Sequence, residues 1–259
     1  MHLNPYLAAI QEAERLRMFL DYDGTLAGFA ENPDEIHPDQ ELIDLLKRVN
    51  ARPGIQLAII SGRRLDHIRK LIPLQGILLA GTYGIEIQDP AGRRSDQVRF
   101  ESIRPALEKL LPQWLELIRP YPEIYLEDKG WSLALHAKFL SSDTASKVLE
   151  QARKIIQDDD FPAQLFRVLG GHKFLEIAPR VANKGFTVRY LLSKEPLHGA
   201  LPIYIGDDDK DEEAFEAILE NSGVAIKVGS QPGKTLAQAY LESPQAVREF
   251  LASLLKPTG

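Results

Sequence analysis

The sequence predicts an α/β fold, in which a parallel sheet carries helices on both faces and a smaller α+β module interrupts it along the chain. Continuous apolar runs such as "IQLAII" at 55–60 and "GVAIKV" at 223–228 alternate with helical stretches, which is typical of parallel strands buried on both faces. The strand candidate at 131–137 instead alternates apolar and polar residues. Polar side chains follow several of the apolar runs, where open α/β sheets bind their ligands.

The predicted core comprises residues 1–103 and 180–259. Its first strand ends at Leu20, and the next helix has apolar residues at helical spacing behind Asp39, a candidate N-cap. The remaining core elements are a strand at 55–60, a helix at 63–72, two short strands around a glycine turn at 77–87, a helix that starts at Lys184, a strand at 202–206, a helix at 214–220, a strand at 223–228 and two final amphipathic pieces.

The predicted module occupies residues 104–179. An amphipathic helix precedes two strands, and a second helix precedes two more strands; these elements are expected at 104–118, 124–128, 131–137, 144–156, 164–171 and 173–179. In the strand at 131–137, three apolar residues alternate with Ser132, Ala134 and His136. This alternation predicts an antiparallel strand with one buried face.

Composition excludes several classes of function. The 259 residues include no cysteine, which rules out a thiol nucleophile, a disulfide framework and a cysteine zinc site. A formal net charge of −6 argues against general binding of nucleic acid. We find no apolar stretch of signal-peptide or membrane-spanning type, and we therefore expect a cytoplasmic protein that binds no membrane. We also expect a monomer.

Polar residues follow four predicted core strands. They are Asp21 and Asp23 in "DYDGT", then Ser61, then Thr82, then Asp207 and Asp208, and Lys184 begins a later helix. Clustered carboxylates suit a hard divalent cation such as Mg²⁺. A cation flanked by a lysine and a serine suits a phosphate group.

These segments resemble the four signature motifs of the haloacid-dehalogenase-like phosphatases, in the same order along the chain: "DYDGT", "SGR", "NKG" and "GDDDKDE". The stretches "FLDYDGTL", "EDKGWSLALH", "LEIAP" and "GDDDKDEEAF" are similar to the trehalose-6-phosphate phosphatases in particular. The resemblance covers nearly the whole chain. It implies a Rossmann-like parallel core of the haloacid-dehalogenase type, with residues 104–179 as an inserted α+β cap domain.

The resemblance also implies roles for single residues. Asp21 would be the nucleophile that becomes an aspartyl-phosphate, and Asp23 the general acid and then the general base. Ser61 and Lys184 would bind the phosphoryl oxygens. Mg²⁺ would be bound by the carboxylates of Asp21 and Asp207 and the backbone carbonyl of Asp23, with Asp208 and Asp211 supporting it. Substrate-binding residues would be Arg63, Glu127, Lys129 and Glu176, with Ser132 and His136 as weaker candidates.

The implied reaction is Mg²⁺-dependent hydrolysis of a sugar phosphate, with trehalose 6-phosphate as the expected substrate. Tyr83 and Lys210 stand where the family often has His and Thr, and these departures leave other sugar phosphates open as substrates. A phosphatase for sucrose phosphate or for mannosyl- or glucosyl-3-phosphoglycerate is the first alternative. A sugar phosphomutase and a non-catalytic sugar-phosphate binding protein are the others.

Taken singly, the motif residues also have structural alternatives. Ser61 could cap the following helix, Lys184 could be a surface lysine, and Glu127 and Lys129 could form an exposed ion pair. The acids of "DDDKDEE" could simply begin a helix, since acids favour helix N-termini. The joint order of the motifs, each beside the end of an apolar strand, favours the catalytic interpretation.

Overall fold

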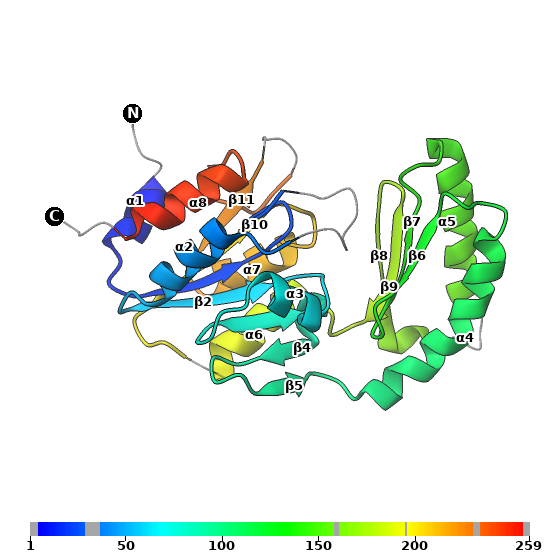
Figure 1. Ribbon diagram of the computed structural model, residues 1–259, viewed down its shortest axis with the longest axis horizontal. Helices are drawn as coiled ribbons and strands as arrows, with labels where there is room; N and C mark the ends of the chain where they lie inside the picture. Colours follow the sequence, from blue (N-terminus) through cyan, green and yellow to red (C-terminus); the bar gives the residue numbers. More distant parts are fainter. Residues whose placement is uncertain (1–4, 29–36, 158–160, 195, 230–233, 256–259) are drawn as a thin grey trace. The chain divides into compact units, whose positions relative to one another are not determined.

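The chain folds into two compact units in a computed structural model that describes residues 5–28, 37–157, 161–194, 196–229 and 234–255. The first unit combines Met1–Gln97 with Asn183–Gly259, and the second is Val98–Ala182 (Figure 1). The second unit therefore overlaps the range 104–179 for which we predicted an inserted module. Each unit is described by itself below.

The first unit is built on a mostly parallel sheet, as predicted. Within the described residues this sheet has eight strands in the order β12-β11-β10-β1-β2-β3-β4-β5. All neighbours from β12 to β3 pair in parallel, while β4 and β5 are antiparallel additions at one edge. The strands are β1 (Leu16–Leu20), β2 (Ile55–Ile60), β3 (Leu78–Gly81), β4 (Glu86–Gln88), β5 (Arg94–Asp96), β10 (Leu201–Gly206), β11 (Val224–Val228) and β12 (Ala239–Leu241).

Helices cover both faces of this sheet (Figure 1). Successive residues of a strand point to opposite faces: Met18 and Leu20 pack in one apolar cluster, whereas Phe19 packs in the other. The first cluster includes residues of α1 (Pro5–Glu12), α2 (Gln40–Asn50), α3 (Leu65–Leu71) and α8 (Pro244–Ser253); the second includes residues of α6 (Lys184–Lys194) and α7 (Glu212–Glu220). Burial on both faces explains why these strands are continuous apolar runs.

Local signals account for some element boundaries and miss others. Asp39 caps α2 as predicted, because its side chain accepts hydrogen bonds from the backbone N–H groups of Glu41 and Leu42. We did not predict α1, which has Ile10 as its one fully buried residue, or β5, whose residues are all exposed. Neither segment carries the apolar periodicity on which the prediction relied.

The second unit is an α+β arrangement with a four-stranded antiparallel sheet in the order β6-β7-β9-β8. Along the chain, one helix precedes each pair of strands, and Figure 1 shows both helices on one side of the sheet. The elements are α4 (Phe100–Ile118), β6 (Tyr125–Asp128), β7 (Leu133–His136), α5 (Ser142–Ile156), a short 3₁₀ turn at Ala163–Leu165, β8 (Phe166–Gly171) and β9 (Phe174–Pro179).

The strand β7 differs from its predicted pattern. It is antiparallel to both of its neighbours, as expected. The expectation of one buried face is wrong, because Ser132 and Ala134 are as fully buried as Leu133 and Leu135. Ser132 tolerates burial because its hydroxyl donates to the carboxylate of Glu176 at 2.6 Å, which satisfies a polar group that would otherwise be costly to bury.

The length and composition of the helices matter for the prediction that the protein binds no membrane. Within the described part of the chain, none of them combines the length and the apolar character that a bilayer-spanning segment needs. The cytoplasmic location and the monomeric state stay predictions.

Candidate active site

Three of the predicted site residues directly follow neighbouring parallel strands. Asp21 follows β1, Ser61 follows β2 and Asp207 follows β10. Because β1 lies between β10 and β2 and runs parallel to both, the carboxyl ends of the three strands meet at one edge of the sheet. This edge is where an open α/β sheet binds its ligands.

A glycine turn brings Asp207 close to the chain after β1. Gly24 has φ +76, and a Cβ at this position would lie 2.2 Å from Asp207 Oδ2. A side chain here would therefore displace the Asp207 carboxylate, and glycine also accommodates the positive φ without strain. The hydroxyl of Thr25 donates to Asp207 Oδ1 at 3.3 Å, so the "DYDGT" turn contacts Asp207 directly.

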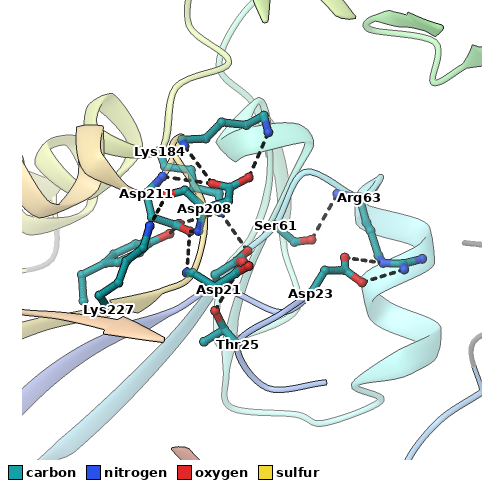
Figure 2. A network of polar contacts seen from close by, with 12 residues as sticks. Asp21, Asp23, Thr25, Ser61, Arg63, Lys184, Asp208, Asp211 and Lys227 are labelled. Atoms are coloured by element: carbon teal, nitrogen blue, oxygen red, sulfur yellow. Dashed lines mark hydrogen bonds and ion pairs between the residues drawn. The ribbon is translucent and has the colours of Figure 1, made fainter. Parts of the chain in front are cut away.

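Charged side chains gather where these segments meet, and we call Asp21, Lys184, Asp207 and Asp211 the strand-end cluster. Asp207 is half-buried and the other three are buried; Figure 2 labels Asp21, Lys184 and Asp211. Lys184 Nζ lies 2.9 Å from Asp21 Oδ1 and 2.6 Å from Asp211 Oδ1. The three aspartates each offer one carboxylate oxygen, and these oxygens all lie within 4.8 Å of one another. Lys184 is only 2% exposed, which rules out the alternative of a surface lysine.

Asp211 is the most fully bonded of the carboxylates. The Tyr204 hydroxyl donates to its Oδ1 at 2.7 Å, in addition to Lys184. The backbone N–H groups of Asp207 and Asp208 both donate to its Oδ2 at 2.9 Å. The loop after β10 is thus wrapped around the Asp211 side chain, which fixes the backbone that carries Asp207.

Burial and crowding of like charges shift the pKa values of these groups. Burial raises the pKa of Asp21 well above its ordinary value, although Lys184 opposes the effect. Burial also raises the pKa of Asp211, again against Lys184. Burial, with the charges of Asp211 and Asp208, raises the pKa of Asp207 to about 6. Burial alone would lower the pKa of Lys184, but Asp21 and Asp211 hold it well above its usual range.

These shifts and the donor set together fit a divalent metal ion. Desolvation and neighbouring carboxylates disfavour full ionisation of the aspartates, so a cation among them would relieve an unfavourable arrangement. All the available ligand atoms are oxygens, which Mg²⁺ prefers. A buried carboxylate held by a lysine beside such an ion can serve as a nucleophile toward a phosphoryl group.

The carboxylate of Asp208, which we predicted to support the metal, is bound by Lys210. The Lys210 backbone N–H donates to Asp208 Oδ1 at 2.8 Å, and Lys210 Nζ donates to Oδ2 at 2.9 Å. Burial would raise the pKa of Asp208, but Lys184 and Lys210 lower it below its ordinary value. The structure thus brings Asp211, rather than Asp208, into the group of three carboxylates. Lys210, which departs from the family pattern, donates both of these hydrogen bonds to Asp208.

Asp23 also lies apart from the strand-end cluster. Its two carboxylate oxygens accept hydrogen bonds from Arg63 Nε and Nη2, both at 2.7 Å, and Figure 2 shows this pair to one side of Asp21. The side chains predicted as acid–base group and substrate ligand are therefore paired with each other. Ser61 is buried, and its Oγ accepts from the Arg63 backbone N–H at 3.1 Å. It does not cap α3, which begins at Leu65 without a side-chain cap.

The residues predicted to bind the sugar lie in the second unit, where Glu127, Lys129, Ser132 and Glu176 form what we call the Lys129 cluster. Lys129 Nζ lies 3.1 Å from Glu176 Oε1 and 3.9 Å from Glu127 Oε2. His136 Nε2 lies 3.0 Å from Glu127 Oε2. Lys129 is 7% exposed and Glu176 is fully buried, so the alternative of an exposed Glu127–Lys129 ion pair is wrong.

Two residues of the site escaped the sequence analysis. Tyr204 is a tyrosine inside a continuous apolar strand, and its hydroxyl bonds Asp211 as described above. Lys227 lies in β11, and its Nζ donates to the backbone carbonyl of Asp208 at 3.1 Å. A polar tip within a buried strand must find a partner, and this signal was present in "PIYIG" and "GVAIKV".

Comparisons with known proteins find relatives along most of the chain. A family model described as trehalose-phosphatase matches residues 19–245. The protein named probable trehalose-phosphate phosphatase D of Arabidopsis thaliana is 31% identical over 263 residues, which cover 96% of this chain and 70% of that relative. The family match includes all the residues of both clusters.

Solved structures share the fold. The C-terminal domain of C. albicans trehalose-6-phosphate phosphatase has a TM-score of 0.84 at 24% identity and covers 97% of this chain and 95% of its own. A haloacid dehalogenase-like hydrolase from Bacteroides thetaiotaomicron has a TM-score of 0.64 at 17% identity and covers 92% of this chain and 99% of its own. The predicted fold class and the predicted enzyme class, a phosphoric monoester hydrolase, are confirmed. The chain belongs to the trehalose-phosphatase family.

Proposed function

We propose that this chain hydrolyses trehalose 6-phosphate to trehalose and phosphate, in a Mg²⁺-dependent reaction that passes through an aspartyl-phosphate on Asp21. The observation that carries the proposal is the buried Asp21 carboxylate, held 2.9 Å from Lys184 Nζ within the group formed with Asp207 and Asp211. The substrate is inferred from the family and from the names of the relatives.

In the first step, an Asp21 carboxylate oxygen attacks the phosphorus atom. The bond between phosphorus and the sugar oxygen breaks, and its electron pair leaves with that oxygen, which takes a proton from Asp23. Lys184, already ion-paired with Asp21, orients the nucleophile and binds phosphoryl oxygens together with Ser61. Fixed donors of this kind stabilise the transferring group because they need no rearrangement during the reaction.

In the second step, water attacks the phosphorus atom of the aspartyl-phosphate. Asp23 accepts a proton from this water, the bond between phosphorus and Asp21 breaks, and the Asp21 carboxylate is restored as phosphate leaves. Proton transfer in both directions by one carboxylate is ordinary acid–base catalysis.

The carboxylates of Asp21 and Asp207 and the backbone carbonyl of Asp23 would hold Mg²⁺, and Asp211, whose oxygens already accept four hydrogen bonds, would support them. When bound, the ion supplies positive charge against the repulsion between a carboxylate and a phosphate, which is about 4 kcal/mol for two unit charges 4 Å apart at an effective dielectric constant near 20. Within the chain, Lys184 contributes a further positive charge.

The pairing of Asp23 with Arg63 fits an enzyme without substrate. A carboxylate that accepts two hydrogen bonds from a guanidinium is oriented as a base, and the acid role requires the pair to open. We infer that the substrate phosphate competes with Asp23 for Arg63, which would free Asp23 to carry the proton for the leaving sugar oxygen.

The second unit would act as the cap that selects the sugar. Glu127, Lys129 and Glu176 offer carboxylate acceptors and an ammonium donor within one small area. Sugar hydroxyls both donate and accept hydrogen bonds, so such a set can orient them. Glu176 is fully buried and Lys129 nearly so, which reduces competition from water and strengthens each polar contact.

A phosphate-release panel tests the proposal. Purified protein is assayed with trehalose 6-phosphate, sucrose phosphate, and mannosyl- and glucosyl-3-phosphoglycerate, each with Mg²⁺ and with a chelator. We expect efficient release from trehalose 6-phosphate with Mg²⁺ and none with chelator. Efficient cleavage of another substrate alone would replace the substrate, an isomerised sugar phosphate without free phosphate would indicate a mutase, and binding without turnover would refute the enzyme proposal.

A further inference from the structure

The segment after β3 has an unusual backbone. Thr82, Tyr83 and Gly84 form a 3₁₀ turn in which φ is +48, +57 and +98, respectively. Left-handed conformations are unfavourable for residues with a side chain, above all for a β-branched one such as Thr82. Two such residues in succession persist only where the surroundings hold them, and strain of this kind is concentrated at functional sites.

The turn holds the loop that carries Ser61 and Arg63. The backbone N–H of Thr82 donates to the carbonyl of Arg63 at 2.7 Å, and the N–H of Tyr83 donates to the carbonyl of Ser61 at 2.8 Å. A Cβ on Gly62 would lie 2.8 Å from the Tyr83 ring, so the ring packs directly on this loop. The strained backbone thus aims two N–H groups at the loop.

Thr187 of α6 anchors the other side of the turn. Its hydroxyl donates to the backbone carbonyl of Tyr83 at 2.9 Å, and the residue is 1% exposed. Gly84 packs so closely on Thr187 that a Cβ there would lie 1.8 Å from the threonine Oγ1. Lys184 lies three residues earlier in the same helix, and residues at this spacing are neighbours on a helix surface.

We propose that Thr187 is a positioning residue that sets Ser61 and Arg63 relative to Lys184, so that the three converge on one phosphate group. The path runs from the Thr187 hydroxyl to the Tyr83 carbonyl, and from the turn to the loop through the hydrogen bonds of Thr82 and Tyr83. The inference rests on the proposed function, because it takes the ligand of Ser61, Arg63 and Lys184 to be phosphate.

The test removes the Thr187 hydroxyl and keeps the shape of the side chain. Thr187→Val lacks the donor at nearly the same volume, and Thr187→Ser keeps the donor. Misplacing groups that bind a reacting phosphate by about 1 Å costs up to about 100-fold in rate. For Thr187→Val we therefore expect kcat/KM for trehalose 6-phosphate to fall about 10- to 100-fold, and the dissociation constant for inorganic phosphate, measured by calorimetry with Mg²⁺, to rise about 10-fold.

Two controls separate positioning from stability. Thr187→Ser should restore both constants, because its hydroxyl can still reach the Tyr83 carbonyl. Ser193→Ala removes another hydroxyl of α6, one that donates to the Tyr190 carbonyl of the same helix, and should leave both constants unchanged. Thr187→Ala gives a second route to the same loss if valine disturbs folding.

The outcomes distinguish this inference from the proposed function. If Thr187→Val melts at a lower temperature but binds phosphate with wild-type affinity, the hydroxyl is merely structural and the inference is overturned. Wild-type protein that does not bind phosphate would overturn it as well. Wild-type protein that binds phosphate, with weakened binding in Thr187→Val, but hydrolyses no sugar phosphate would overturn the proposed function and support the positioning role.

Discussion

The strand-end cluster and the Lys129 cluster both bury a lysine against carboxylates, yet they differ in how well the protein satisfies the charges. In the strand-end cluster, Lys184 is the one positive charge beside three aspartates, and the Thr25 and Tyr204 hydroxyls and two backbone N–H groups also donate to them. The pKa values of all three aspartates are raised, with burial as the largest cause. In the Lys129 cluster, Glu127 and Glu176 contact the ammonium of Lys129. Glu176 also accepts from the Ser132 hydroxyl, and Glu127 contacts the His136 imidazole. Counted on the Lys, Asp and Glu side chains alone, the first cluster has two more carboxylates than lysines, whereas the second has one more.

This difference indicates that two similar sets of residues contribute differently to folding stability. A site that must receive a cation and a phosphate keeps an unfavourable arrangement when it is empty, and the rest of the fold compensates for it. A buried pair completed by protein donors instead contributes to a single ordered arrangement, and removing either partner leaves an unpaired charge. The two clusters should therefore respond in opposite ways to loss of a carboxylate.

The largest expected effect is on turnover, from Asp21→Asn. Loss of the nucleophile should lower kcat for phosphate release by at least about 1,000-fold, since groups at the centre of the chemistry carry effects of this size or more. Folding stability should stay the same or increase, because the amide removes a charge that burial disfavours. Phosphate release and thermal unfolding, both followed without and with Mg²⁺, check the two expectations.

Residual turnover by Asp21→Asn near the wild-type level would mean that the nucleophile is misassigned. A large drop in stability would mean that the Asp21 carboxylate contributes to folding, and the contrast between the clusters would fail. Asp209→Asn, an exposed acid in the loop after β10, is the matched control and should change neither property.

Glu176→Gln should have the largest effect on stability. Breaking a buried ion pair by removing one partner costs about 3 kcal/mol or more, because Lys129 keeps its charge while losing its closest carboxylate. Both tryptophans, Trp114 and Trp131, lie in the second unit, so urea unfolding followed by tryptophan fluorescence reports on this unit. Glu123→Gln, at an exposed position of the same unit, should change the unfolding free energy by less than about 0.5 kcal/mol.

An unchanged fluorescence midpoint for Glu176→Gln would show that the Lys129 cluster does not stabilise the second unit. In that case neither cluster would contribute to folding stability through its buried carboxylates, and the two regions would be alike.

The sequence predicted where the site lies in the fold, but not how its side chains pair. The parallel core followed from continuous apolar strands, and the positions of Asp21, Ser61 and Asp207 followed from the rule that ligands bind at the carboxyl ends of strands. Such statements depend on local pattern and topology. They do not depend on side-chain orientation, and this is where the sequence analysis fell short.

Side-chain pairing could not be read from the motifs. Nothing in "DYDGT" and "SGR" indicates that Asp23 pairs with Arg63, because the two segments come together only when β1 and β2 pair. Lys210 was identified as a departure from the family pattern, but its contact with Asp208 depends on the conformation of the loop after β10. The burial of Ser132 likewise depends on Glu176, a residue on a neighbouring strand of the sheet.

Adding metal should change the free energy of unfolding less than the loss of Glu176 does. We expect this effect only in the first unit, which contains the strand-end cluster. A ligand present at 100 times its dissociation constant stabilises the folded state by about 2.7 kcal/mol. We expect Mg²⁺ added to chelator-treated protein to approach this value, and Asp207→Asn to abolish the response because it removes one of the two carboxylate ligands. Far-UV circular dichroism during thermal unfolding measures the shift.

Asp209→Asn serves here as well, because it removes the same charge from the same loop at an exposed position. It should keep the wild-type response to Mg²⁺. A response that is lost equally in both variants would indicate a general effect of charge, and one that survives in Asp207→Asn would place the ion elsewhere.

The smallest effects come from single hydroxyl donors, one that contacts the strand-end cluster and one within the Lys129 cluster. Tyr204→Phe removes the O–H that donates to Asp211 at 2.7 Å, and Ser132→Ala removes the O–H that donates to Glu176 at 2.6 Å. Each bond is made to a buried carboxylate, so each loss should cost about 1.5 kcal/mol in chelator-treated protein. Urea unfolding provides the measurement.

Adding Mg²⁺ should have different effects on the stability of Tyr204→Phe and of Ser132→Ala. Without the tyrosine donor, Asp211 has a lone pair that a cation can satisfy, so Mg²⁺ should recover part of the stability lost in Tyr204→Phe. The serine variant should recover none, because its carboxylate belongs to a cluster that the protein has already completed. Tyr240→Phe, in β12, controls for loss of a tyrosine hydroxyl elsewhere in the first unit. Equal recovery in Tyr204→Phe and Ser132→Ala would show that the ion stabilises both units alike, which contradicts a metal site confined to the strand ends.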